Sequence, residues 1–206
     1  MTAKANSNYS YLALGDSYTI GESVPPADNF PNQTVQFLNA AGYGFKPAEI
    51  VAKTGWTTDE LQNNINGHSF NPPYGIVTLL IGVNNQYRGL SVDNYKPEFE
   101  NLLQQAIQFA GNKVDHVIVL SIPDWGVTPF ANGRDRDQIA REIDAYNAAN
   151  KAISEQYKVN YIDITLWTRE AANDLTLIAP DGLHPSAKEY KRWSEKLADK
   201  IKAIIQ

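Results

Sequence analysis

Short apolar segments alternate along this chain with longer segments whose apolar positions recur every three or four residues. The apolar segments, which predict strands, are residues 9–14, 48–52, 75–82, 116–122 and 159–164. Helical periodicity appears in residues 30–41, around Leu61 and Ile65, in 97–110, after the charged run 134–137, and from about Ser186 onward. Parallel neighbouring strands need crossover helices, so the alternation predicts an α/β fold: one parallel sheet between two helical layers.

The length of 206 residues suits a single domain spanning residues 1–206, and no internal repeat or linker interrupts it. Residues 75–82 form the most strand-like run, apolar and β-branched enough for a central strand.

A glycine, an acid and a serine follow the first predicted strand, as Gly15-Asp16-Ser17. The glycine permits a tight turn, which places Ser17 at or just past the carboxyl end of that strand, where sites in open α/β sheets form. A serine hydroxyl is a poor nucleophile at neutral pH and needs a base to take its proton. We interpret Asp16 as a structural residue of the turn.

Only three histidines can supply that base. His116 stands at the start of a predicted strand, and His68 lies in a polar loop, where we expect it to be solvated. His184 lies in a turn before the last helix, three residues after Asp181. That spacing lets one loop present an imidazole together with the carboxylate that orients it, so Ser17, His184 and Asp181 are the predicted catalytic residues.

These segments are similar to the sequence blocks of the GDSL, or SGNH, hydrolase family of serine esterases and lipases. The resemblance rests on Gly15-Asp16-Ser17, Gly82-Val83-Asn84 and Asp181-x-x-His184, whose order and spacing span nearly the whole chain. It implies the flavodoxin-like strand order 2-1-3-4-5 and acyl transfer through an acyl-enzyme intermediate without a cofactor.

The resemblance also implies an oxyanion hole. Its donors would be the backbone amides of Ser17 and Gly55 and the side-chain amide of Asn84. The third block departs from the family at one position, because Asn85 stands where the family usually has aspartate. This departure puts in doubt the support that the aspartate gives to its loop.

Four further residues follow the predicted strands at the same edge of the sheet, and they are candidates for lining an acyl or sugar pocket: Trp56, Tyr87, Arg88 and Trp125. The alternative is that the aromatic rings anchor loops and that Arg88 is merely solvated. No long insertion that could form a lid is present, which favours small substrates.

The leading hypothesis is therefore a serine ester hydrolase for short-acyl esters, including an acetyl group on a carbohydrate. One alternative is a lysophospholipase or thioesterase, and another is a catalytically idle carbohydrate-binding protein on the same fold. A flavin or nucleotide binder is disfavoured, because Asp16 stands where phosphate would bind and no Gly-x-Gly-x-x-Gly occurs.

Composition and charge limit the kinds of binding partner and the cellular compartment that we expect. A net charge of -5 argues against nucleic acid, and the absence of cysteine excludes disulfides, thiolate metal sites and a cysteine nucleophile. The sequence contains no cluster of histidine and acidic residues that would predict a metal site, and no apolar run approaches the roughly 20 residues of a membrane span.

The first eight residues lack the apolar core of a signal peptide, so the sequence predicts a cytoplasmic protein, or a secreted or periplasmic one if a signal has been removed. Nothing indicates the oligomeric state.

Overall fold

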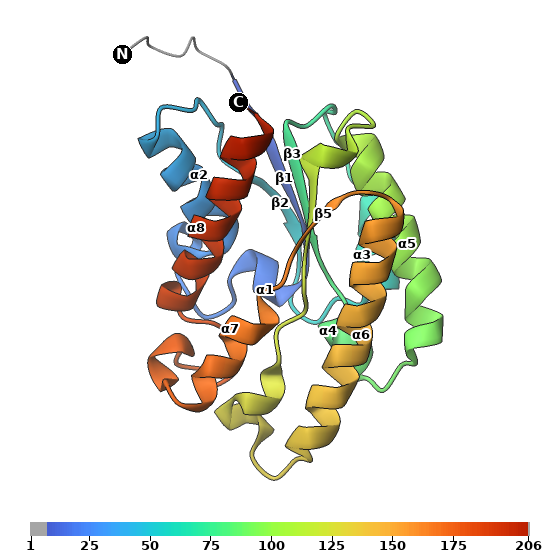
Figure 1. The fold of residues 1–206 in the computed structure, drawn as a ribbon, viewed down its shortest axis with the longest axis vertical. Helices are drawn as coiled ribbons and strands as arrows, with labels where there is room; N and C mark the ends of the chain where they lie inside the picture. Colours follow the sequence, from blue (N-terminus) through green and yellow to red (C-terminus); the bar gives the residue numbers. More distant parts are fainter. Residues whose placement is uncertain (1–7, 206) are drawn as a thin grey trace.

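A parallel five-stranded sheet forms the centre of the fold, with the strand order β2-β1-β3-β4-β5 (Figure 1). The computed structural model describes residues 8–205, so the amino-terminal stretch searched for a signal lies largely outside the described residues. The strands are β1 (Tyr11–Gly15), β2 (Glu49–Ala52), β3 (Ile76–Leu80), β4 (Val117–Leu120) and β5 (Asn160–Ile162). Every pairing between neighbouring strands is parallel. Both the parallel sheet and its strand order are those predicted.

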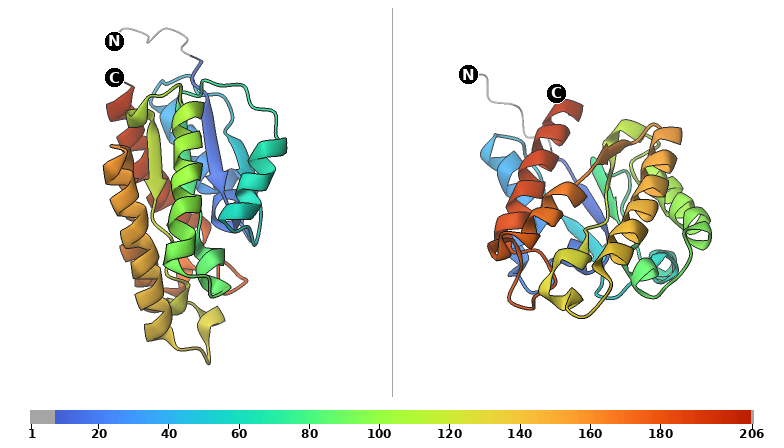
Figure 2. Two further views of the ribbon diagram at one scale, coloured as in Figure 1. Left: turned by 90° about the vertical axis from the view of Figure 1, so that its right-hand side faces the viewer. Right: turned by 60° about the horizontal axis from the view of Figure 1, so that its bottom comes forward.

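Helices cover both faces of this sheet. Figure 1 shows α2 and α8 on one side and α3, α5 and α6 on the other. Their bounds are α2 (Phe30–Ala40), α3 (Thr58–Gly67), α5 (Val92–Phe109), α6 (Arg136–Gln156) and α8 (Ala187–Ile204). Figure 2 shows α5 and α6 side by side on their face. The result is the three-layer arrangement that the sequence predicts.

The inner strands are buried along their whole length, because helices pack on both of their faces. Every residue of β1, β3 and β4 is buried. The polar Thr78 within β3 is accommodated by a hydrogen bond of 3.0 Å between its hydroxyl and that of Tyr11. On the face of the sheet that α2 and α8 cover, Phe30 of α2 packs against Tyr190 and Trp193 of α8.

Several predicted bounds need correction. The helix expected at 97–110 begins at Val92, because Ser91 caps it through the backbone N–H of Asn94, 3.2 Å away. Pro97 is held inside this helix and does not start it. The strand expected from residue 9 begins at Tyr11, and His116 lies in a 3-10 turn before β4.

Short helices follow three of the strands and were not predicted. They are α1 (Ser17–Ile20), α4 (Val83–Tyr87) and α7 (Thr165–Arg169). Each begins two or three residues after its strand ends, and Figure 1 shows them in the middle and lower part of the view, with the start of α6 below them. Side chains carried by these helices therefore meet at the carboxyl edge of the sheet.

Candidate active site

Ser17 occupies the first position of α1, and only Asp16 separates it from Gly15, the last residue of β1. The Asp16 side chain caps this short helix by accepting the backbone N–H of Tyr18 at 3.0 Å. A Cβ atom at position 15 would lie only 2.1 Å from Oγ1 of Thr19, so the strand-to-helix turn requires glycine. The Ser17 side chain opens into a cavity although the residue is only 4% exposed.

His184 lies beside Ser17 at the end of a closed loop. Its Nε2 is 3.0 Å from Oγ of Ser17, and its Nδ1 is 2.6 Å from Oδ2 of Asp181. The loop is closed by a hydrogen bond of 2.7 Å from the Ala179 N–H to the His184 carbonyl. Gly182 takes a φ of +73° within it, which favours glycine. The structure thus brings the three predicted catalytic residues into one hydrogen-bonded chain.

The Asp181 carboxylate accepts four hydrogen bonds. Oδ1 accepts the backbone N–H groups of Leu183 and His184, each at 3.0 Å. Oδ2 contacts the His184 ring and accepts the Ser23 hydroxyl at 2.7 Å. Burial alone would raise the pKa of Asp181, but these hydrogen bonds outweigh it and lower the pKa to about 2. The carboxylate is therefore ionised at neutral pH.

Sequence reasoning missed Ser23. This serine stands in a polar loop 158 residues before its partner and adopts a φ of +66°, which is uncommon for a residue other than glycine. No motif marks it. Only the approach of the loop after α1 to the loop before α8 reveals that its hydroxyl supports the carboxylate of Asp181.

Gly55 and Asn84 line the same cavity as Ser17 and His184. Gly55 has a φ of +85°, a backbone conformation that side chains disfavour. The Asn84 side chain donates one hydrogen bond, of 2.9 Å, to the Trp56 carbonyl. An amide nitrogen carries two donors, so one remains for a ligand. The residues predicted to supply the oxyanion donors thus line one cavity with the Ser17 hydroxyl.

Asn85 follows Asn84 in α4 and joins this helix to Thr58, the first residue of α3. It is fully buried, accepts the backbone N–H of Thr58 at 3.1 Å, and donates its Nδ2 to the Thr58 hydroxyl at 2.7 Å. That hydroxyl in turn donates to Glu98. The amide therefore supplies a donor that an ionised aspartate would lack, and the support of the loop is retained by a different set of hydrogen bonds.

The cavity has a volume of about 170 Å³. It is lined by Ser17, Tyr18, Thr54, Gly55, Val83, Asn84, Tyr87, Trp125, Phe130, Leu183 and His184. Of the four predicted pocket residues, Tyr87 and Trp125 belong to this lining. Trp56 and Arg88 lie outside it: Trp56 contributes its carbonyl to Asn84, and Arg88 is held by Glu60 at 3.1 Å and by the Gly55 carbonyl at 2.7 Å.

Three aromatic rings form one side of the cavity, and we call Tyr87, Trp125 and Phe130 the aromatic wall. Trp125 meets Tyr87 and Phe130 edge to face, with ring centroids 5.4 and 5.9 Å apart. Its indole N–H donates to Oε1 of Gln86 at 2.8 Å. Trp125 is 4% exposed, whereas Tyr87 and Phe130 are 44% and 42% exposed. The wall therefore has a fixed buried centre and two accessible edges.

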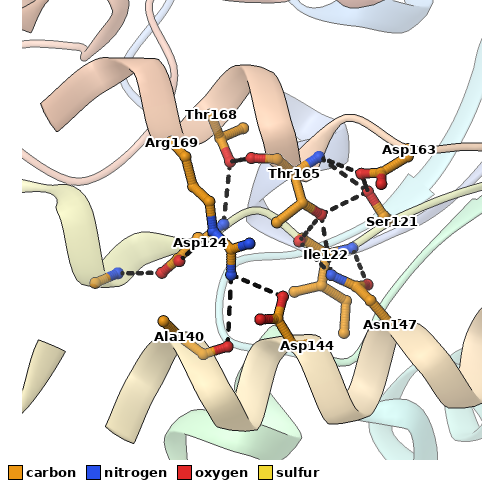
Figure 3. Close-up of polar contacts among 11 residues, drawn as sticks. Ser121, Ile122, Asp124, Ala140, Asp144, Asn147, Asp163, Thr165, Thr168 and Arg169 are labelled. Atoms are coloured by element: carbon orange, nitrogen blue, oxygen red, sulfur yellow. Dashed lines mark hydrogen bonds and ion pairs between the residues drawn. The ribbon is translucent and has the colours of Figure 1, made fainter. Parts of the chain in front are cut away.

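An ion pair between the buried Asp124 and the partly exposed Arg169 holds the turn that carries Trp125 (Figure 3). The Asp124 side chain is 1% exposed, and its Oδ2 accepts Nε of Arg169 at 2.8 Å. Its Oδ1 accepts the backbone N–H of Gly126 at 2.9 Å. Arg169 also contacts Asp144 of α6 at 2.7 Å, so α7, α6 and the Trp125 turn are joined. Sequence reasoning missed this pair too.

The other histidines lie away from this site. His116 Nδ1 is 2.6 Å from the carbonyl of Gly75, and His68 contacts Glu49 at 3.2 Å. Within residues 8–205, no group of three or more histidine or acidic side chains is placed to hold a metal ion. Over the same described range, no helix has the length and apolarity to cross a membrane.

Comparison with known proteins agrees with this fold. The model of the GDSL-like lipase/acylhydrolase family matches residues 13–192, and no curated protein matches the sequence significantly. Among solved structures, TesA superposes with a TM-score of 0.73 at 17% identity, covering 95% of this chain and 99% of its own.

Two solved esterases are similar in the same way. An acetylxylan esterase from Geobacillus stearothermophilus superposes with a TM-score of 0.74 at 19% identity over 96% of each chain. A psychrotrophic esterase from Pseudoalteromonas sp., inhibited by monoethylphosphonate, gives 0.72 at 18% identity, covering 95% of this chain and 98% of its own. The family match over most of the chain and the shared fold identify this protein as an ester hydrolase of the GDSL-like lipase/acylhydrolase family.

Proposed function

We propose that this chain hydrolyses carboxylic esters of short acyl groups, with Ser17 as the nucleophile. The observation that carries the proposal is the hydrogen-bonded chain from Ser17 through His184 to Asp181, which opens into the cavity lined by Gly55 and Asn84. A nucleophile, a base and oxyanion donors around one cavity are what acyl transfer requires.

In the first step, Oγ of Ser17 attacks the ester carbonyl while Nε2 of His184 takes the hydroxyl proton. Asp181, ionised and hydrogen-bonded to Nδ1, stabilises the imidazolium that forms. The negative charge that develops on the carbonyl oxygen is stabilised by hydrogen bonds from the backbone N–H groups of Ser17 and Gly55 and from Nδ2 of Asn84. The first N–H groups of a helix have no acceptor within the helix, so the Ser17 amide at the start of α1 suits this role.

The attack produces a tetrahedral intermediate. When it collapses, the bond to the alcohol oxygen breaks, the alcohol takes the proton from His184, and the acyl group stays on Ser17. Water then attacks the acyl-enzyme, and His184 accepts its proton and returns it to Oγ. The products are a carboxylic acid and an alcohol, and both proton transfers use the same nitrogen. The residues named here need no further group to complete the cycle.

The size of the cavity favours a short acyl group. A cavity of about 150 Å³ accommodates benzene, so about 170 Å³ suits a group of a few carbon atoms and its ester linkage. The aromatic wall closes one side of it, which would obstruct a long chain. The fold similarity to an acetylxylan esterase is consistent with a small acyl group.

Initial rates on p-nitrophenyl esters from acetate to dodecanoate test the proposal, with Ser17→Ala measured alongside. We expect kcat/KM to be highest between acetate and butyrate, and the variant to lose about 10⁶-fold in kcat, as when the serine of subtilisin is removed. A maximum at long chains would replace the short-acyl assignment by the lysophospholipase or thioesterase alternative. Equal rates for the two proteins would overturn the role of Ser17.

A further inference from the structure

A second groove, of about 370 Å³, adjoins the catalytic cavity on the far side of the aromatic wall. The two hollows share Tyr87 and Trp125 in their linings. We propose that this outer groove binds the alcohol portion of the ester and that this portion is an uncharged saccharide. The proposal rests on the ester hydrolysis proposed above. It concerns the alcohol half of the substrate, whose chemistry the catalytic cavity does not determine.

The outer groove offers hydrogen-bond donors through Arg134. Its guanidinium lies over the rings of Tyr87, Trp125 and Phe130, at 5.1, 5.3 and 5.7 Å from their centroids. It donates one hydrogen bond, of 3.1 Å, from Nη2 to the Tyr87 hydroxyl. Within residues 8–205 it forms no ion pair, so several of its five N–H donors remain for a ligand in the groove.

The acceptors of the groove come from α6. Glu142 accepts the side-chain amides of Gln138 at 2.8 Å and Gln86 at 2.6 Å, one on each carboxylate oxygen. Each oxygen keeps a further lone pair, and Gln138 is exposed. Because Gln86 also receives the indole N–H of Trp125, the acceptors are fixed relative to the aromatic wall.

This combination matches a saccharide better than an anionic or an apolar group. Sugar hydroxyls both donate and accept, which suits a site holding guanidinium, amide and carboxylate groups together. The groove carries two acids, Asp135 and Glu142, against the single cation Arg134, so a phosphate or carboxylate group would meet a net negative charge. The exposed side chain of Tyr87, which lines both hollows, offers apolar surface to the C–H groups of a sugar ring.

The test compares two acetate esters: a neutral acetylated xylo-oligosaccharide, which is long enough to enter the outer groove, and p-nitrophenyl acetate, which is not. Arg134→Gln and Gln138→Ala remove two separate contacts of the groove. Arg141→Gln is the control, because Arg141 is an exposed arginine of α6 outside the groove. The measured quantity is the ratio of kcat/KM for the saccharide ester to kcat/KM for p-nitrophenyl acetate.

We expect this ratio to fall about tenfold in each groove variant, the loss expected for one hydrogen bond, mainly through a higher KM for the saccharide. The control should keep the ratio of the parent protein. An unchanged ratio in both groove variants would overturn the proposal, and so would faster hydrolysis of an anionic ester than of the neutral saccharide ester. If instead the parent protein and Ser17→Ala are equally inactive on p-nitrophenyl acetate, it is the proposed ester hydrolysis that fails.

Discussion

Ser23 and His184 share one oxygen atom of Asp181. The Ser23 hydroxyl lies 2.7 Å from Oδ2, and Nδ1 of His184 lies 2.6 Å from the same atom. A carboxylate held by a second donor rotates less freely, so Ser23 fixes the oxygen that orients the imidazole. One segment of the chain thereby holds both ends of the catalytic chain, since α1 begins with Ser17 and the loop after it supplies Ser23.

Removing this hydroxyl should lower kcat about tenfold, equivalent to about 1.4 kcal/mol in the barrier. Ser23→Gly and Ser23→Ala both remove it, but only glycine relaxes the φ of +66°. We expect similar kcat losses in the two variants on p-nitrophenyl acetate, with glycine the more stable protein. Ser69→Ala, at an exposed serine, is the control. Full kcat in either Ser23 variant would show that Asp181 does not need this support.

Restoring the family's usual residue should destabilise this protein. In Asn85→Asp, the carboxylate cannot donate to the Thr58 hydroxyl and comes close to Glu98, which that hydroxyl contacts. We expect a loss of about 1–3 kcal/mol in the free energy of unfolding, as for a buried hydrogen bond that is broken. Urea unfolding of both single variants and of the Asn85→Asp, Glu98→Gln double variant measures it. Since the amide at 98 removes the second charge, the double variant should recover part of the loss; additive losses would contradict this coupling.

The ion pair in Figure 3 should matter more for stability than the exposed ion pairs do. Arg169→Met leaves Asp124 buried without a charged partner, which should cost about 2–4 kcal/mol, somewhat below a fully buried pair because Arg169 is partly exposed. Lys188→Met removes an exposed pair with Asp174 and should cost much less, because solvent screens exposed charges. Thermal and urea unfolding compare them. Equal costs would show that Asp124 gains nothing from Arg169.

Asp16 should make stability depend on pH. Burial raises its pKa from 3.8 to about 7, although the hydrogen bond from the Tyr18 N–H partly opposes this. The folded chain therefore holds a proton that the unfolded chain releases between about pH 4 and 7, so the free energy of unfolding falls as pH rises through that window and levels off above it.

Asp16→Asn removes this titration and keeps the capping acceptor, because asparagine caps helices as well as aspartate. Between pH 4.5 and 7.5, we expect the parent protein to lose up to a few kcal/mol relative to the variant, at about 1.4 kcal/mol per pKa unit. Measurements above pH 4.5 exclude the effect of Asp181 on stability, because the lowered pKa of its carboxylate changes the free energy of unfolding only between about pH 4 and 2. A difference between the two proteins that stays constant across the range would contradict the raised pKa.

The fold could be predicted because its information is local. Buried parallel strands are continuous apolar runs and the main helices are amphipathic, so 75–82 and the helix from Ser186 are recognised without knowledge of the rest. The predicted start of a helix was wrong where the same residue type occurs both at helix starts and inside helices. Pro97 is typical of a helix start, yet here it lies inside α5 because Ser91 caps that helix earlier.

The site could be predicted in part for the same reason. Asp181 and His184 are three residues apart, and Ser17 follows a recognisable strand, so each can be found from its neighbours in the sequence. Ser23 and Arg169 could not, because each acts on a carboxylate that only tertiary structure brings near: Ser23 on Asp181, and Arg169 on Asp124. Trp56 and Arg88 have the chemistry of pocket residues, but neither lines the cavity, and Arg88 is held by Glu60 and by the Gly55 carbonyl.

If Ser17 is the nucleophile and His184 activates it, Ser17 should react covalently with an electrophilic phosphorus reagent. The intact protein is treated with a fluorophosphonate, and the adduct is counted and located by mass spectrometry of the protein and its peptides. We expect one adduct per chain, on Ser17, which is absent from Ser17→Ala and forms far more slowly in His184→Ala. No adduct, or an adduct on another serine that persists in Ser17→Ala, would contradict this expectation.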